Sequence, residues 1–169
     1  MSKPSFSLTE QAIENIACNV KDAPIDRIKL LRLLHHVSLK LDERFSQSLK
    51  PLGVNQTEWM TLIFLFSAGS KKFFPSELAK SLNCSRTNAT RLIEALKKRS
   101  FIHCTVNSSD RRKMQISLNQ EGRAFVDKHL PEQFQNVNEM VEDIFTREEE
   151  ELFFNLNMKM LKYLEQKKY

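Results

Sequence analysis

The feature that most constrains this chain is a pair of helix-forming segments, 75–82 and 85–99, separated only by Asn83 and Cys84. Four apolar residues of the second segment recur at helical spacing, namely Ala89, Leu92, Ile93 and Leu96. They give that helix one apolar face. Ser85 precedes it, and a serine hydroxyl is a good acceptor for an unpaired backbone N–H at a helix start. Two short helices joined by such a tight turn predict a helix-turn-helix.

The other face of segment 85–99 carries hydroxyl, amide and guanidinium groups near its amino end. The residues are Ser85, Arg86, Thr87, Asn88, Thr90 and Arg91. Such groups suit the phosphates and base edges of DNA. Taken alone, this face is equally well explained as the solvated side of a surface helix. The neighbouring sequence has to separate the two interpretations.

Beyond Ser100 the pattern changes from helical to alternating. Apolar and polar residues alternate over 102–106 and again over 114–118, with the polar segment 107–113 between them. This pattern predicts a β-hairpin, and a hairpin directly after the second helix makes a winged helix. The expected tip of the wing carries Asp110, Arg111 and Arg112.

Helical patterns flank this central region. A short helix is expected around 8–20, a long one from Pro24 to about residue 50, and further helices after Asn119 and after Thr146, with Pro131 kinking or resetting the chain between them. The long helices have heptad-like apolar seams, which predict packing on each other and on a second copy. The expected fold is mainly α with a small β-hairpin, a winged helix-turn-helix at 53–118 flanked by dimerisation helices at 24–52 and 119–169, after an extension at 1–23.

Charge is distributed unevenly along the chain. Nine lysines and arginines against three acids give residues 75–113 a charge of +6, whereas residues 114–169, with seven against eleven, carry −4. A localised basic segment is typical of proteins with a polyanion partner, although a solvated basic surface would have the same composition. No apolar run is long enough to span a membrane, and the amino terminus lacks the apolar centre of a signal peptide, so we expect a cytoplasmic protein.

Five short motifs together resemble the MarR family of bacterial transcriptional regulators, in particular the branch that represses multidrug efflux operons. They are Pro75–Ala79, Ser85–Arg91, Leu96–Arg99, Asp110–Arg112 and Leu118–Gly122. The resemblance covers roughly residues 25–164 in the same order of elements. Asn119 stands where the family usually has threonine, and Ser100 stands where it usually has glycine.

The resemblance implies a homodimer whose two recognition helices enter successive major grooves of a pseudo-palindromic operator in double-stranded DNA. Segment 85–91 would supply the contacts in the major groove, and Arg112 would reach into the minor groove. Asp110 would orient a neighbouring arginine, although a turn residue that bonds its own backbone is an equally good interpretation. The implied protein is a repressor.

The resemblance also implies a pocket for a small hydrophobic or phenolic effector, which would release the repressor from DNA. The candidate lining residues are Arg32, His35, His36, Trp59, Met60 and Phe64. Each of the apolar ones is explained as well by a place in the core.

Some other classes of function are less well supported by the sequence. The sequence has no glycine-rich phosphate loop, no metal-type cluster and no nucleophile–base arrangement, so we expect neither an enzyme nor a cofactor. The three cysteines show no metal-type spacing. Cys18 lies where some relatives sense oxidants, which makes a redox-sensing regulator one alternative, with three inert thiols as the plainer interpretation. A winged helix that binds proteins and not DNA is another.

Overall fold

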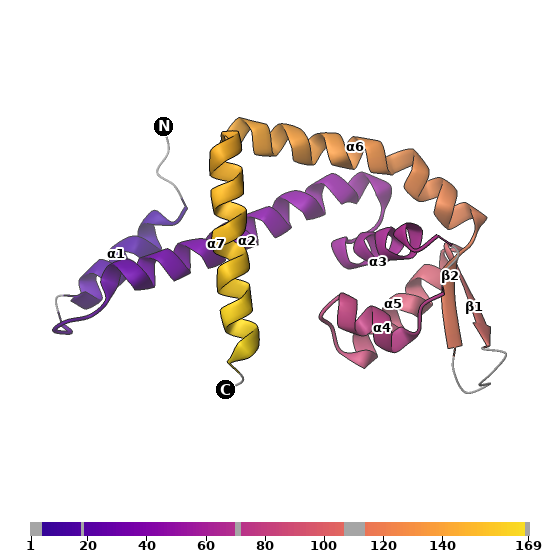
Figure 1. The fold of residues 1–169 in the computed structure, drawn as a ribbon, viewed down its shortest axis with the longest axis horizontal. Coiled ribbons are helices and arrows are strands. Elements are labelled where there is room, and N and C mark those ends of the chain that lie inside the picture. The colour runs from indigo at the N-terminus through magenta and orange to yellow at the C-terminus, as the bar shows by residue number, and fades with distance from the viewer. Residues whose placement is uncertain (1–4, 18, 70–71, 107–113, 168–169) are drawn as a thin grey trace. The chain divides into compact units, whose positions relative to one another are not determined.

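The computed structural model describes residues 5–17, 19–69, 72–106 and 114–167, which form helices and a two-stranded antiparallel hairpin (Figure 1). The chain packs as two units, residues 1–61 and residues 62–169. The mainly helical fold with a hairpin after the helix-turn-helix confirms the predicted class.

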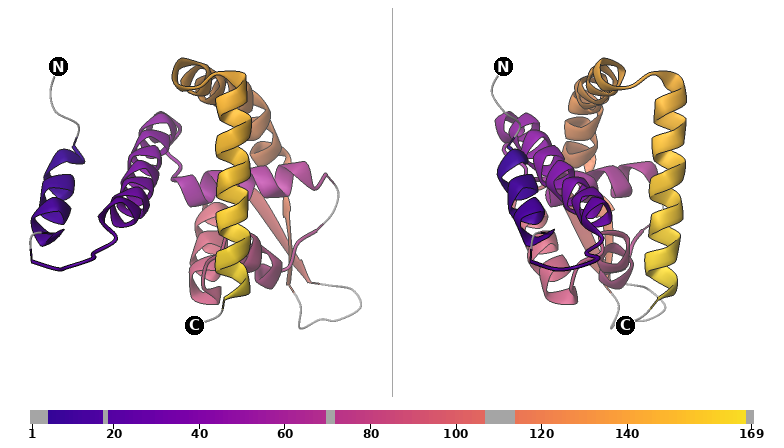
Figure 2. Two further views of the ribbon diagram at one scale, coloured as in Figure 1. Left: turned by 60° about the vertical axis from the view of Figure 1, so that its left-hand side comes forward. Right: turned by 90° about the vertical axis from the view of Figure 1, so that its left-hand side faces the viewer.

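The first unit begins with two helices, α1 (Ser7–Ala17) and α2 (Ile25–Leu49). They lie side by side (Figure 2). Ile13 of α1 is buried, and the ammonium group of Lys29 pairs with the carboxylates of Glu10 and Glu14. Because the Glu14 carboxylate accepts a hydrogen bond from it, the pKa of Lys29 is raised. The predicted short amino-terminal helix is thus present, and ion pairs join it to α2.

The long helix α2 ends where the sequence predicted. A turn of 3-10 helix, Lys50–Leu52, follows it, and Gly53 then takes a left-handed backbone conformation (φ 67°) that glycine adopts without cost. The next helix, α3 (Gln56–Ser67), starts with a reciprocal cap. The Asn55 side chain accepts from the backbone N–H of Glu58, and the Glu58 carboxylate accepts from that of Asn55, both at 2.9 Å. These bonds satisfy two donors that a helix start leaves unpaired.

The second unit contains the helix-turn-helix. Helix α4 spans Pro75–Ser81, and helix α5 spans Arg86–Lys98. In the turn between them Asn83 has a left-handed backbone (φ 48°), and the backbone N–H of Cys84 donates to the carbonyl oxygen of Ala79 at 2.9 Å. Asparagine tolerates this conformation better than most residues do, which lets the chain turn within the four residues between the two helices.

The predicted hairpin is present as β1 (Ile102–Val106) and β2 (Met114–Leu118), with Cys104 opposite Ile116. Phe73 adds a one-residue bridge to the other edge of β2, because its N–H and carbonyl pair with those of Ile116 at 2.9 and 2.8 Å. The wing tip, residues 107–113, lies outside the described residues.

One apolar core joins the elements of the second unit. Its buried members are Leu62, Leu65, Leu78, Leu92, Ile93, Leu96, Ile102, Ile116 and Val126. They come from α3, α4, α5, both strands and the first turns of α6. The apolar face predicted for α5 is therefore turned into this core, which leaves its polar face outward.

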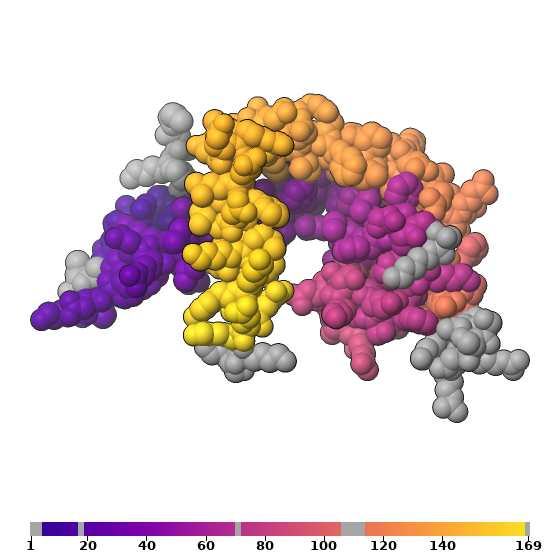
Figure 3. All heavy atoms as spheres, viewed as in Figure 1, coloured from indigo at the N-terminus to yellow at the C-terminus, as the bar shows by residue number. Residues whose placement is uncertain are grey.

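Two long helices complete the chain, α6 (Gln120–Ile144) and α7 (Arg147–Gln166). Helix α6 runs on through Pro131. The proline removes one backbone hydrogen bond, and the remaining bonds carry the helix past it, so the expected reset is wrong. Helix α7 starts with a reciprocal cap between Thr146 and Glu149, at 3.4 and 2.9 Å. None of its residues is buried. The face of α7 that is turned to the viewer in the space-filling view is not covered by other parts of the chain (Figure 3).

Candidate nucleic-acid interface

The amino end of α5 forms the surface that the sequence predicted. The Ser85 hydroxyl oxygen accepts a hydrogen bond from the backbone N–H of Asn88 at 3.2 Å, so the helix starts where the serine stands. The six predicted contact residues, Ser85, Arg86, Thr87, Asn88, Thr90 and Arg91, are all exposed. They therefore lie together at the exposed amino end of the helix.

The side chains on this face differ in what they can offer a ligand. Within the described part of the chain, the side chains of Arg86, Asn88 and Arg91 form no hydrogen bond or ion pair, which leaves their donors to solvent. The Thr90 hydroxyl already donates to the carbonyl of Arg86 at 3.0 Å, so it presents an acceptor. Two guanidinium groups and an amide on one exposed helix face can bind phosphates and base edges.

Only the two strands of the wing are described, and its tip is not. Asp110, Arg111 and Arg112 lie outside the described residues, so their roles stay predictions. Lys72 is a cation that the sequence reasoning did not select. Its ammonium nitrogen lies 3.4 Å from the Thr105 hydroxyl of β1, which adds a positive charge beside the hairpin. The adjacent lysines 71 and 72 in the sequence were the signal that pointed to it.

The six candidate pocket residues occupy different environments. Arg32 and His35 are exposed on α2, Met60 is exposed on α3, and Trp59 of α3 is buried. Phe64 is half-buried.

His36 contacts the two residues that precede α1. Its Nε2 lies 2.7 Å from the Ser5 hydroxyl oxygen, and its ring centroid is 5.7 Å from that of Phe6. His36 thus contacts the amino-terminal segment. An effector site made by the six residues stays a prediction.

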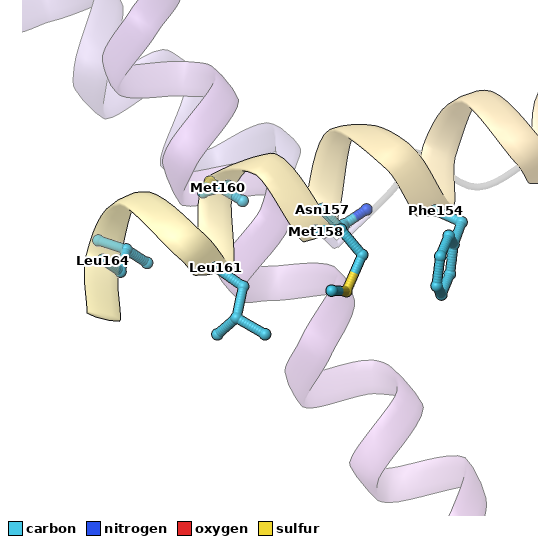
Figure 4. Close-up of a pocket in the computed structure, with 6 residues that line it drawn as sticks. All are labelled: Phe154, Asn157, Met158, Met160, Leu161 and Leu164. Atoms are coloured by element: carbon cyan, nitrogen blue, oxygen red, sulfur yellow. The ribbon is translucent and has the colours of Figure 1, made fainter. Parts of the chain in front are cut away.

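An apolar groove runs along α7 (Figure 4). It is lined by Phe154, Asn157, Met158, Met160, Leu161 and Leu164. Phe154, Met158 and Leu161 project to the same side of the helix in Figure 4, as their spacing of four and three residues requires. This groove lies on a single helix and contains none of the six residues expected around an effector.

The cysteines give little support to redox chemistry. Cys84 and Cys104 are free and half-buried, and burial raises the pKa of the Cys104 thiol, an effect that nearby Lys97 partly offsets. Cys18 lies outside the described residues. Among the residues that the structure describes, no cluster of three or more histidine, cysteine or acidic side chains could hold a metal ion. Within the same ranges no helix is both long and apolar enough to cross a membrane.

Comparisons with known proteins agree with this geometry. The family profile described as MarR family matches residues 54–114. The transcriptional repressor MprA of Escherichia coli K12 is 35% identical over 162 residues, which cover 96% of this chain and 92% of that protein. This chain belongs to the MarR family.

Solved structures show the same fold. The Staphylococcus aureus MepR–DNA complex matches with a TM-score of 0.72 and 20% identity over 78% of this chain and 96% of that chain. AbsC of Streptomyces coelicolor, described as a MarR family transcriptional regulator, matches with a TM-score of 0.75 and 18% identity over 82% and 93%. As a MarR-family protein, the chain is a DNA-binding transcriptional regulator and not an enzyme.

Proposed function

We propose that this protein is a homodimeric repressor that binds a pseudo-palindromic operator and is released from it by a small hydrophobic or phenolic effector. The observation that carries the DNA part is the exposed face of α5. Arg86, Asn88 and Arg91 lie outward on it with open donors, while the opposite side is held in the core. Arg112 of the wing would extend the contact into the minor groove, and Asp110 would orient a neighbouring arginine.

The helices at both ends of the chain support the dimer. On α7 the exposed apolar residues include Leu152, Phe153, Phe154, Leu156, Leu161 and Leu164. On α2 they include Leu30, Leu31, Leu33, Val37 and Leu39. Apolar faces of this extent are rarely left in water by a monomer. A second copy would cover them, and a two-fold dimer matches the symmetry of a pseudo-palindrome.

The proposed effector would act on the spacing of the two recognition helices. Two recognition helices must lie about 34 Å apart to enter successive major grooves. An effector that binds more tightly to a dimer with another spacing shifts the population toward it and lowers the affinity for DNA. The cation of Arg32 and the imidazoles of His35 and His36 could meet the charge of a phenolic anion, and Trp59, Met60 and Phe64 could meet its ring. MepR, a structural neighbour, is described as a transcription regulator of the multidrug efflux pump MepA of S. aureus.

The DNA assignment is tested by titration. Wild-type protein, Arg91→Ala and Arg112→Ala are titrated against duplexes enriched by the wild type from a randomised library and against random duplex. Lys128→Ala, which removes an exposed cation from α6, is the matched control. We expect a steep loss of wild-type affinity with salt, because several phosphates are neutralised, and a loss of roughly 1–3 kcal/mol for each arginine variant. If both arginine variants bind like the control, the assigned surface is wrong.

The effector part needs a separate experiment. A panel of phenolic acids and uncharged aromatic compounds is added to the preformed protein–DNA complex, and release is followed by fluorescence anisotropy. Release by some members of the panel, lost on Arg32→Ala, is the expected result. A complex that survives the whole panel at millimolar concentration would favour a repressor controlled by its own abundance.

A further inference from the structure

The carboxyl end of α5 closes in a turn that normally requires glycine. The backbone N–H of Phe101 donates to the carbonyl of Leu96 at 3.0 Å, and that of Ser100 donates to the carbonyl of Lys97 at 2.9 Å. This pair of bonds defines the Schellman motif, whose left-handed position is most often glycine. Here the position is held by Ser100, with φ at 55°.

A serine in this conformation costs about 1 kcal/mol, because its Cβ approaches the backbone too closely. The turn is therefore strained at the point where the recognition helix passes into the first strand of the wing. Something else has to stabilise it.

The side chain of Asn119 supplies a bond to this turn. Its amide nitrogen donates to the carbonyl oxygen of Ser100 at 2.5 Å, and its amide oxygen accepts from the backbone N–H of Gly122 at 2.8 Å. Its own backbone N–H donates to the carbonyl of Phe101 at 3.2 Å. One buried residue thus ties the last turn of α5 to the first turn of α6.

Packing around Asn119 leaves this junction little freedom. Gly122 is in such close contact with Phe101 that an added Cβ would lie 2.1 Å from the Phe101 carbonyl oxygen. The Phe101 ring stacks on that of Phe125 with centroids 4.7 Å apart, and the Arg99 guanidinium lies 5.0 Å from the Phe101 centroid.

We infer that Asn119 is a positioning residue for DNA recognition, whose bond to Ser100 holds α5 at a defined orientation on α6 and compensates for serine in the left-handed turn. The inference rests on the proposed function in that α5 must be the helix that reads DNA. A cap alone requires only the acceptor oxygen of Asn119. The amide N–H is the group that bonds to the turn at the end of the recognition helix. Aspartate has no donor in its place, and the single hydroxyl of threonine is needed for the cap.

The experiment is a double-mutant cycle between Asn119→Thr and Ser100→Gly. Threonine keeps an acceptor for the Gly122 N–H and loses the bond to Ser100. We expect Asn119→Thr to weaken binding to duplexes enriched by the wild type about five- to tenfold, the equivalent of one hydrogen bond. Binding to random duplex should stay unchanged, because phosphate contacts do not depend on the orientation of base-reading side chains.

Ser100→Gly should rescue the selective binding of Asn119→Thr to within about twofold, because glycine needs no support in this turn. Asn83→Gly is the matched control: it relaxes another left-handed turn, next to α4, and should rescue nothing. The melting temperature is measured for every variant. If Asn119→Thr lowers only the melting temperature, or if the two glycine variants rescue equally, the inference is overturned.

Two further outcomes are distinguishable. If Asn119→Thr does not fold, the cycle is completed with Asn119→Asp, which keeps a strong cap and also lacks the donor. Equal stability losses from Asn119→Asp in the wild-type and Ser100→Gly backgrounds would then overturn the coupling. If wild-type protein shows no salt-dependent binding to duplex DNA, the proposed function fails. Asn119 then loses its role in recognition, and any coupling to Ser100 in the melting temperature is structural only.

Discussion

An alanine Cβ in place of Gly122 would lie 2.1 Å from the carbonyl oxygen of Phe101 and 2.9 Å from its carbonyl carbon. Both neighbours are backbone atoms between α5 and β1, so they cannot turn aside as a flexible side chain could. The contact between the turn after α5 and the first turn of α6 thus requires a residue without a side chain.

Gly122→Ala should therefore destabilise the protein strongly. We expect a loss of about 3 kcal/mol or more and a melting temperature lower by roughly 6–12 °C, measured at constant protein concentration. Gly69→Ala is the control, since Gly69 has φ at +62° and nothing within 4 Å of an added Cβ. Its cost should be about 1 kcal/mol, that of the backbone conformation alone. Equal effects of the two substitutions would contradict the close contact.

The capping residue of α5 allows stability to be separated from DNA binding. Ser85→Ala removes the acceptor for the Asn88 N–H and should cost about 1 kcal/mol of stability. Ser85→Asp restores an acceptor and favours the positive end of the helix, so its melting temperature should equal that of the wild type or exceed it. The added negative charge faces the phosphates, so its affinity for duplex DNA should fall at least about tenfold. An aspartate variant that binds DNA normally would place the interface elsewhere.

The groove on α7 can be tested through the oligomeric state. Leu161→Glu introduces a charge among Phe154, Met158 and Leu164, which a dimer seam would have to bury without a partner. We expect monomers in analytical ultracentrifugation and a loss of DNA affinity of at least about tenfold, because the two half-sites are no longer bound by linked helices. Lys159→Gln on the same helix is exposed and should leave the dimer intact. A dimeric Leu161→Glu protein would exclude this face from the seam.

The thiol of Cys104 gives a prediction for pH. Because burial raises its pKa, the reactive thiolate is scarcer near neutral pH than for an exposed cysteine. Alkylation by iodoacetamide, followed by mass spectrometry of the Cys104 peptide, should be slow at pH 7. It should rise with pH through a midpoint above the usual value of 9.0. The folded state disfavours the Cys104 thiolate. This thiol therefore lowers the free energy of unfolding only when the pH rises past 9.0, the usual pKa of a cysteine. Rapid alkylation at pH 7 would contradict the burial of this thiol.

Local sequence signals predicted the helix starts well. Ser85, Asn119 and Thr146 each cap the helix that follows them, because a short polar side chain reaches a backbone N–H three residues on without help from the rest of the fold. The change from helical to alternating periodicity predicted the hairpin equally well, because burial on one side selects the period of two.

Local sequence signals do not predict contacts between residues that are distant in the chain. Nothing local indicates that Phe73 pairs with Ile116 or that Lys72 lies beside Thr105. The helix through Pro131 also contradicted the local rule, since one missing hydrogen bond is outweighed by the helical bonds on either side.

The sequence by itself determined the order of the elements, the side of α5 that faces the core and the basic character of the segment around it. These properties follow from side-chain spacing and charge within short stretches of chain. Only the tertiary structure decided how the recognition helix is held: by a serine in a left-handed turn, an asparagine that bonds to it from the start of α6, and a glycine that lets the two backbones touch. Such an arrangement depends on residues about twenty positions apart, whose contact is set by the packing of the whole unit and not by the pattern of either segment.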